Sequence, residues 1–162
     1  MTDPWRELYE REYPRLLRAL VALGRDPAAA EDAAQEAFVK AHRSGIERIA
    51  KPAAWLFVVG SREVFRRAKR ARRERDLWAS LPARNDAIDT VSDRADLLAA
   101  LGELPERQRT VVVARYFYGL SYDEIADHFE IKSGTVGATL HQAIERLRQI
   151  QLSGRLARGA MR

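Results

Sequence analysis

The segment from residue 62 to residue 75 carries the clearest chemistry of this chain. Eight of its fourteen residues are Lys or Arg, against two carboxylates, Glu63 and Glu74. A helix with this charge density repels itself unless a polyanion lies beside it, and each phosphate that a cation neutralises adds salt-dependent affinity. The segment therefore predicts DNA binding, with a merely solubilising face as the alternative. The candidate contacts are Arg62, Arg66, Arg67, Lys69, Arg70 and Arg73.

A second candidate surface combines acidic and apolar groups. Asp32, Gln35, Glu36 and Val39 are spaced i, i+3, i+4 and i+7, so on a helix they share one side. Two carboxylates, an amide and an apolar group suit docking against a basic helix of a partner protein. The alternative is an ordinary solvated helix face, which acidic residues commonly form.

The pattern gives no support to enzymatic or metal chemistry. The histidines His42, His128 and His141 form no ligand cluster, and the chain has neither a Gly-rich phosphate loop nor a nucleophile motif. We therefore expect no catalytic residues, no metal and no cofactor.

Composition narrows the cellular setting. The chain has no cysteine, which excludes disulfides and zinc–cysteine sites and is compatible with a reducing cytoplasm. No apolar run approaches the roughly 20 residues that span a bilayer. The sequence start lacks the basic and then apolar pattern of a secretory signal. We expect a cytoplasmic protein.

Helical periodicity must position these residues. The chain has 162 residues, 46% of them hydrophobic, which suffices for two small helical domains. Apolar spacing predicts a helix near the start, then helices over 28–42 and 52–78. We expect an all-α fold in which residues 1–78 form one domain, 79–94 a polar linker, 95–152 a second domain and 153–162 a flexible basic tail.

The second domain contains a predicted helix-turn-helix. Ser121 and Glu124 have the spacing of a capping box at the start of its first helix. Ser133 is expected to cap a second helix, and such a helix is the usual reader of a DNA major groove. The excess of positive charge lies outside this domain. Residues 95–152 hold 6 Lys/Arg against 8 Asp/Glu, whereas residues 1–78 hold 17 Lys/Arg against 12 Asp/Glu.

Three segments in order resemble the extracytoplasmic-function (group 4) sigma factors of the sigma-70 family. Residues 31–41 and 52–57 are similar to two elements of its conserved region 2, and residues 104–136 to its region 4. The resemblance implies a bacterial protein that recruits core RNA polymerase to promoters and is monomeric when free. It also implies that Asp32, Gln35, Glu36 and Val39 face the polymerase clamp and that the cationic helix faces the −10 DNA. Many members are held by an anti-sigma protein, so such a partner is expected.

The chain departs from the family at both DNA-binding elements. Arg62 and Arg66 stand where the family usually has Asn and Asp. The family commonly follows Gly-Thr-Val with Lys-Ser-Arg, whereas residues 137–139 here are Gly-Ala-Thr, and Glu130 replaces a favoured Gly. We expect weak −35 binding through the contacts that remain, namely Ser133, Thr135, Thr139, His141 and Gln142.

Two other functions stay open at this point. One is a sigma-like regulator that acts by binding polymerase or an anti-sigma partner, with weak or no −35 recognition. The other is a helix-turn-helix repressor with an unrelated N-terminal domain, which would dimerise to read paired half-sites.

Overall fold

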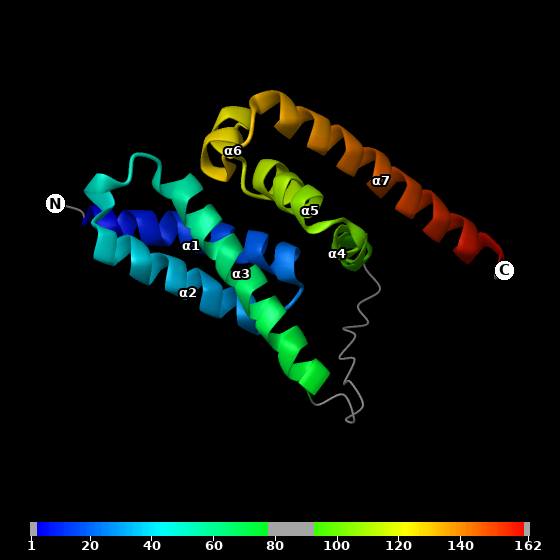
Figure 1. Cartoon of the computed structure of the whole chain (residues 1–162), viewed down its shortest axis with the longest axis horizontal. Coiled ribbons are helices and arrows are strands. Elements are labelled where there is room, and N and C mark those ends of the chain that lie inside the picture. Colours follow the sequence, from blue (N-terminus) through cyan, green and yellow to red (C-terminus); the bar gives the residue numbers. More distant parts are fainter. Residues whose placement is uncertain (1–2, 78–92, 161–162) are drawn as a thin grey trace.

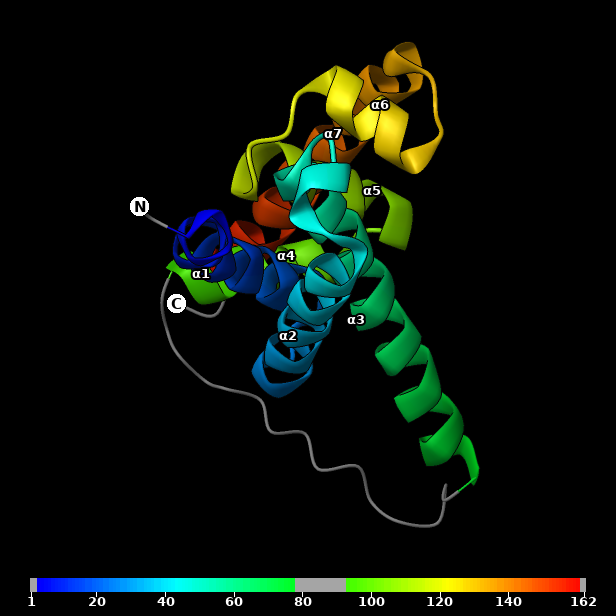
Figure 2. The ribbon, with the colours of Figure 1, turned by 90° about the vertical axis from the view of Figure 1, so that its left-hand side faces the viewer.

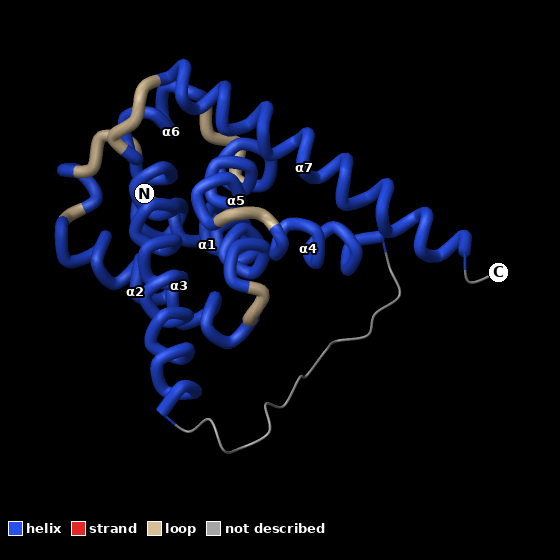
Figure 3. Tube along the Cα trace, turned by 45° about the vertical axis from the view of Figure 1, so that its right-hand side comes forward, coloured by secondary structure: helices blue, strands red, loops and turns tan. Residues whose placement is uncertain are grey.

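The structure is a computed structural model that describes residues 3–77 and 93–160. Helices and loops make up all of these residues, and no strand occurs among them (Figures 1 and 3), which confirms the all-α expectation. The linker predicted over 79–94 lies almost wholly outside the described residues. In chain order the elements are α1 (Pro4–Gly24), α2 (Pro27–Ser44), η1 (Ile46–Arg48), α3 (Pro52–Leu77), α4 (Asp93–Glu103), α5 (Glu106–Val112), η2 (Val113–Phe117), α6 (Tyr122–Phe129) and α7 (Ser133–Ala160).

The first two helices start at carboxylate caps. The Asp3 carboxylate accepts a hydrogen bond from the Trp5 N–H at 3.0 Å, and Asp26 accepts one from the Ala29 N–H at 3.1 Å. Each cap is followed by a proline in the first turn, where the missing N–H is not needed. Pro14 lies inside α1 without ending the helix.

Helices α1, α2 and α3 pack together through small residues. The inner face of α2 is mostly alanine, and all these alanines are buried, which lets its neighbours approach closely. A Cβ placed on Gly60 of α3 would lie 3.0 Å from Cδ1 of Leu20, so glycine allows a close approach to α1 that a larger residue could keep only if the Leu20 side chain shifted. The second half of α3 runs away from the bundle (Figure 2), and residues 71–77 are exposed.

The helix-turn-helix forms as its capping signals predict. The Ser121 hydroxyl accepts from the Glu124 N–H at 3.1 Å, and the Glu124 carboxylate accepts from the Ser121 N–H at 2.8 Å. Helix α7 begins at Ser133 itself, so this residue is the first of the helix and the cap position falls to Lys132.

Most of the predicted tail lies in α7. Residues 153–160 continue this helix, residues 161–162 lie outside the described residues, and the flexibility of the tail stays a prediction. The segment contains no proline, and its glycines weaken a helix by only about 1 kcal/mol each without breaking it.

The amino-terminal and carboxy-terminal halves share one hydrophobic core. The ring of Phe57 from α3 stacks on Tyr118 at a centroid distance of 5.2 Å and meets Phe129 of α6 at 6.2 Å. Arg109 of α5 donates to the carbonyl of Leu23 at the end of α1 at 2.8 Å. Sequence patterns alone gave no indication of this packing.

Candidate nucleic-acid and partner-binding surfaces

The acidic face of α2 is exposed as a continuous ridge. Asp32, Gln35 and Val39 are exposed and Glu36 is half-buried, whereas the intervening alanines and Phe38 point into the core. The helix thus has one side in the core and one side facing solvent. The structure confirms that these residues share one solvent-facing side, as their spacing predicts. We call this set the α2 ridge.

The cationic residues of α3 lie along the outer side of that helix and its projecting end. Arg62, Arg66, Lys69, Arg70 and Arg73 are exposed, and Arg67 is half-buried. Beyond Ala68 the helix has lost most of its contact with the bundle (Figure 2), so Lys69, Arg70 and Arg73 surround a projecting rod. Such a rod can approach phosphates from several sides.

One carboxylate organises the start of the cationic segment. Glu63 is buried, with 5% of its side chain exposed, and accepts hydrogen bonds from Arg66 Nη2 at 2.6 Å, Arg66 Nε at 3.0 Å and Arg67 Nε at 2.8 Å. The hydrogen bond from Arg66 and the further one from Arg67 lower the pKa of Glu63 to about 2, although burial opposes the shift. The carboxylate is therefore ionised at neutral pH.

Arg67 connects the two surfaces. Its Nη1 lies 3.2 Å from Oδ2 of Asp32, so the guanidinium bridges Glu63 on α3 and the α2 ridge. Sequence reasoning assigned Asp32 and Arg67 to different partners and did not foresee this contact, because the two residues are 35 positions apart.

The helix-turn-helix presents fewer contacts than expected. Ser133, His141 and Gln142 are exposed and Thr135 is half-buried. Thr139 has only 8% of its surface exposed, which disfavours DNA contact by its side chain, and its role in binding stays a prediction. Thr139 lies one turn from both Val136 and Ala143, on the side of α7 that packs into the core, and this position accounts for its burial.

The backbone of the turn between α6 and α7 accounts for the family's preference for glycine at position 130. Glu130 has φ +55°, in the left-handed region that glycine adopts at little cost. The glycine that the family favours there suits this backbone, and Glu130 adopts the same conformation with strain.

The contact between the two halves is centred on a buried carboxylate. The Tyr118 hydroxyl donates to Glu12 Oε2 at 3.1 Å, while Arg15 donates to the same carboxylate at 3.1 Å and to the Tyr118 carbonyl at 2.8 Å. Glu12 is 2% exposed and Tyr118 is 1% exposed. Burial, together with the Glu12 charge, raises the pKa of Tyr118 far above its usual range, so the phenol stays protonated and donates.

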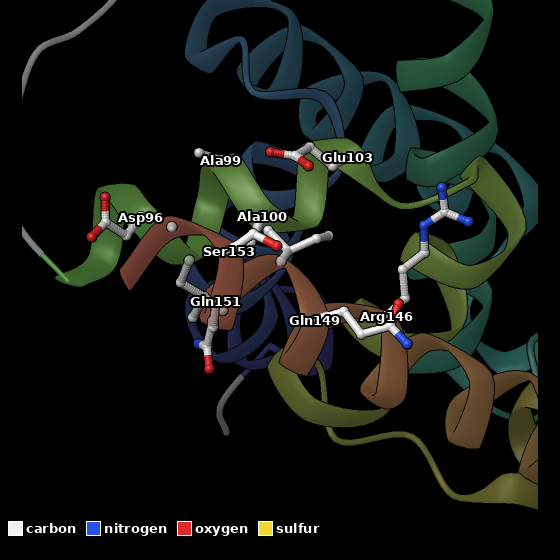
Figure 4. A pocket seen from close by; sticks show the side chains of 11 residues that line it. Asp96, Ala99, Ala100, Glu103, Arg146, Gln149, Gln151 and Ser153 are labelled. Carbon is white, nitrogen blue, oxygen red and sulfur yellow. The ribbon is translucent and has the colours of Figure 1, made fainter. Parts of the chain in front are cut away.

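A groove of about 1010 Å³ lies between α4 and the second half of α7. Figure 4 shows Asp96 and Glu103 of α4 across from Arg146, Gln149 and Ser153 of α7. The lining mixes polar side chains with apolar ones, among them Leu97 and Ile150, without pairing a nucleophile with a base. The groove therefore supports no catalytic assignment.

Within the described part of the chain, no group of three or more His, Cys, Asp or Glu side chains is placed to hold a metal ion. None of its helices combines the length and apolar character that a membrane span requires.

Comparison with known proteins agrees with this architecture. Residues 8–74 match the family model of sigma-70 region 2, and residues 94–147 match that of sigma-70 region 4. The chain is 34% identical over 153 residues to the ECF RNA polymerase sigma factor SigL of Mycobacterium tuberculosis, covering 88% of this chain and 86% of SigL. It is also 34% identical over 140 residues to the RNA polymerase sigma-E factor of Streptomyces avermitilis, covering 83% and 77%.

A solved structure shares the fold across both halves. The sigma factor RpoE of Bartonella quintana, crystallised with the anti-sigma factor NepR, superimposes with a TM-score of 0.77 at 22% identity and covers 93% of this chain and 98% of that one. Together with the sequence matches, these findings define the class: the chain is an RNA polymerase sigma factor. It belongs to the extracytoplasmic-function group of the sigma-70 family.

Proposed function

We propose that the α2 ridge binds core RNA polymerase and that α3 binds promoter DNA at the −10 element. The observation that carries this proposal is the separation of charge between two adjacent helices. Carboxylates face outward from α2, and the projecting half of α3 is covered with cations. In this role the chain works in the bacterial cytoplasm, where it binds core polymerase and positions it on promoter DNA. The bond-forming chemistry of RNA synthesis belongs to core polymerase.

The α2 ridge has the chemistry of a protein-docking face. The carboxylates of Asp32 and Glu36 would attract a basic helix of the partner. Val39, one turn further along α2, would add an apolar contact with that partner. A DNA backbone would be repelled by the same carboxylates. The polarity of the ridge therefore favours polymerase over nucleic acid as its ligand.

Promoter binding requires the two halves to separate. The −10 and −35 elements are centred about 25 base pairs apart, which corresponds to about 85 Å of B-DNA. In the structure α3 packs against α6, the first helix of the helix-turn-helix, so the proposed −10 helix and the helix-turn-helix are held together in one packed unit. We propose that residues 1–78 and 95–152 act as two domains joined by the linker 79–94, and that the Tyr118–Glu12 contact breaks on the promoter.

An anti-sigma partner belongs to the same proposal. The solved structure of RpoE, which shares the fold of this chain, is a complex with the anti-sigma factor NepR. We propose that the packed arrangement of this chain is the form that an anti-sigma factor would hold before polymerase is engaged.

Charge reversal on the α2 ridge tests the docking role. The double variant D32R/E36R should lose capture by core polymerase by at least about ten-fold, because two attractive pairs become repulsive. Promoter-dependent run-off transcript should fall in parallel. The matched control is E31R, which changes an exposed carboxylate on the same helix one position away from the ridge. Wild-type capture by a folded D32R/E36R protein would refute the docking role.

A regulator that works mainly by protein binding remains a second candidate, because the buried Thr139 and the missing cations leave α7 poorly equipped for DNA. Gel shift at graded salt separates the two, since a pure protein binder has no duplex affinity even at low salt. The repressor alternative needed an unrelated N-terminal domain, and the match of residues 8–74 to sigma-70 region 2 removes it.

A further inference from the structure

Glu63 is a buried anion inside the helix that carries the DNA-binding cations. We propose that Glu63 is a positioning residue, which fixes the guanidinium groups of Arg66 and Arg67 so that promoter DNA meets them already ordered. The proposal rests on the DNA-binding role of α3 proposed above and adds a determinant of specificity to it.

Burial distinguishes Glu63 from the other carboxylate in the cationic segment. Glu63 is 5% exposed and holds two arginines, whereas Glu74 is 61% exposed and holds Arg70 alone at 3.1 Å. A buried carboxylate is tolerated only when hydrogen bonds and opposite charge compensate its lost hydration. Three N–H groups provide this compensation for Glu63, so the two arginines are tied to a fixed point in the core.

The bonding pattern leaves both arginines able to bind DNA. Arg66 uses Nε and one Nη2 hydrogen for Glu63, and a guanidinium has five N–H donors in a planar fork. Arg67 uses Nε for Glu63 and Nη1 for Asp32, which leaves its Nη2 group available. Each plane is thus oriented while unused donors remain for phosphate or base edges.

Ordering and charge act in opposite directions on affinity. The Glu63 charge cancels one cation and so lowers attraction to any duplex. Fixed arginines, however, lose less side-chain freedom when they bind one geometry, which favours the correct site. The quantity that Glu63 should control is therefore the ratio of promoter affinity to affinity for a scrambled duplex.

The test compares E63Q with E74Q in complexes assembled from the full chain and core polymerase. Both variants add the same charge to the same helix, and affinities for promoter and scrambled duplexes are measured across a salt series. E74Q should strengthen binding to both duplexes by up to about five-fold at 0.15 M salt and leave their ratio unchanged. E63Q should strengthen scrambled-duplex binding similarly but lower the ratio by about ten-fold, because two side chains lose their order.

A second variant separates positioning from charge and from folding. R66K keeps the positive charge at an exposed position but cannot form the two-bond contact with Glu63. It should lower the ratio by several-fold with little change in the salt dependence. This variant carries the test should E63Q fail to fold, which thermal unfolding shows directly.

The outcomes distinguish this inference from the proposed function. The positioning role would be overturned if E63Q, E74Q and wild type had the same ratio of promoter affinity to scrambled-duplex affinity while DNA binding by both variants depended more steeply on salt. That result would leave α3 as the DNA-binding helix. No change in salt dependence for either variant on any duplex would mean that α3 does not contact DNA, and the proposed function of that helix would fail with it.

Discussion

The two elements that this family presents to DNA are unequal in this chain. Helix α3 exposes a dense set of cations on a projecting rod, whereas α7 has no Lys or Arg between Lys132 and Arg146. Both elements nevertheless keep their folds, because Val136, Leu140 and Ala143 still supply the buried face of α7. The residues that hold the helix-turn-helix fold and those proposed to contact DNA therefore lie on different faces of α7.

Contact with the amino-terminal half helps to hold the helix-turn-helix in place. Tyr118 lies just before α6 and is buried against Phe57 and Glu12 of the other half. The helix-turn-helix, whose proposed DNA-reading helix is poor in cations, is therefore rich in contacts within the protein. Substitutions on one face at a time separate the contribution of the packing from that of the exposed side chains.

The largest effect is expected where the two halves meet. The variant Y118A should lower the free energy of unfolding by about 3–5 kcal/mol, because it removes a buried ring and leaves Glu12 with one fewer donor. Chemical denaturation of the full chain measures this loss. Y118F keeps the ring and should lose only about 1–2 kcal/mol. A loss below about 1 kcal/mol for Y118A would indicate that the two halves do not pack in solution.

A gain of charge on α7 should make the two DNA-binding elements more alike. Gly137 is half-buried and Ala138 is exposed, so G137K/A138R places two cations near the DNA side without filling the core. Duplex affinity should rise by about five-fold per cation at 0.15 M salt, or about 25-fold together, with a steeper salt dependence. Fluorescence anisotropy at graded salt measures both quantities.

The matched variant for this gain is T139R, which adds a cation at the buried position. It should destabilise the protein instead of strengthening DNA binding, since Thr139 has little exposed surface. Duplex affinity that stays at the wild-type level in G137K/A138R would show that α7 faces away from DNA altogether.

The smallest effect is expected from a substitution at Gly137 that changes helix stability without changing charge. A Cβ at Gly137 would lie 3.7 Å from the Tyr122 ring, an ordinary contact, so no steric reason requires glycine there. The variant G137A should stabilise the chain by up to about 1 kcal/mol through helix propensity and leave DNA affinity unchanged. Thermal unfolding and anisotropy test the two parts, and a destabilised variant would show that the α7 backbone differs from a regular helix at this point.

Local signals in the sequence predicted most of the helices. The capping box of Ser121 and Glu124 formed as its spacing indicates, and the predicted helix over 52–78 matches α3 within one residue. The α2 ridge and the exposed cations of α3 were also predictable, because helical spacing alone determines which residues share a face.

The contacts between distant segments were not predictable in this way. The Tyr118–Glu12 hydrogen bond joins residues 106 positions apart, and the stretch that delivers Tyr118 is a π-helix that no periodicity indicated. The same holds for Thr139, whose burial depends on how α7 packs and not on its polar character. The sequence shows Glu63 only as one of two carboxylates in a basic segment. Its burial and its contacts with two arginines are visible only in the folded structure.

The most direct test of the account measures the salt dependence of promoter binding by the polymerase complex for two triple variants. K69A/R70A/R73A removes cations from α3, and S133A/H141A/Q142A removes the exposed polar side chains of α7. The account predicts that the α3 variant loses about 100-fold in affinity at 0.15 M salt, with the slope of log K against log salt smaller by up to about 2.7, and that the α7 variant keeps the wild-type slope. A wild-type slope in the α3 variant with a large loss of affinity in the α7 variant would contradict the account.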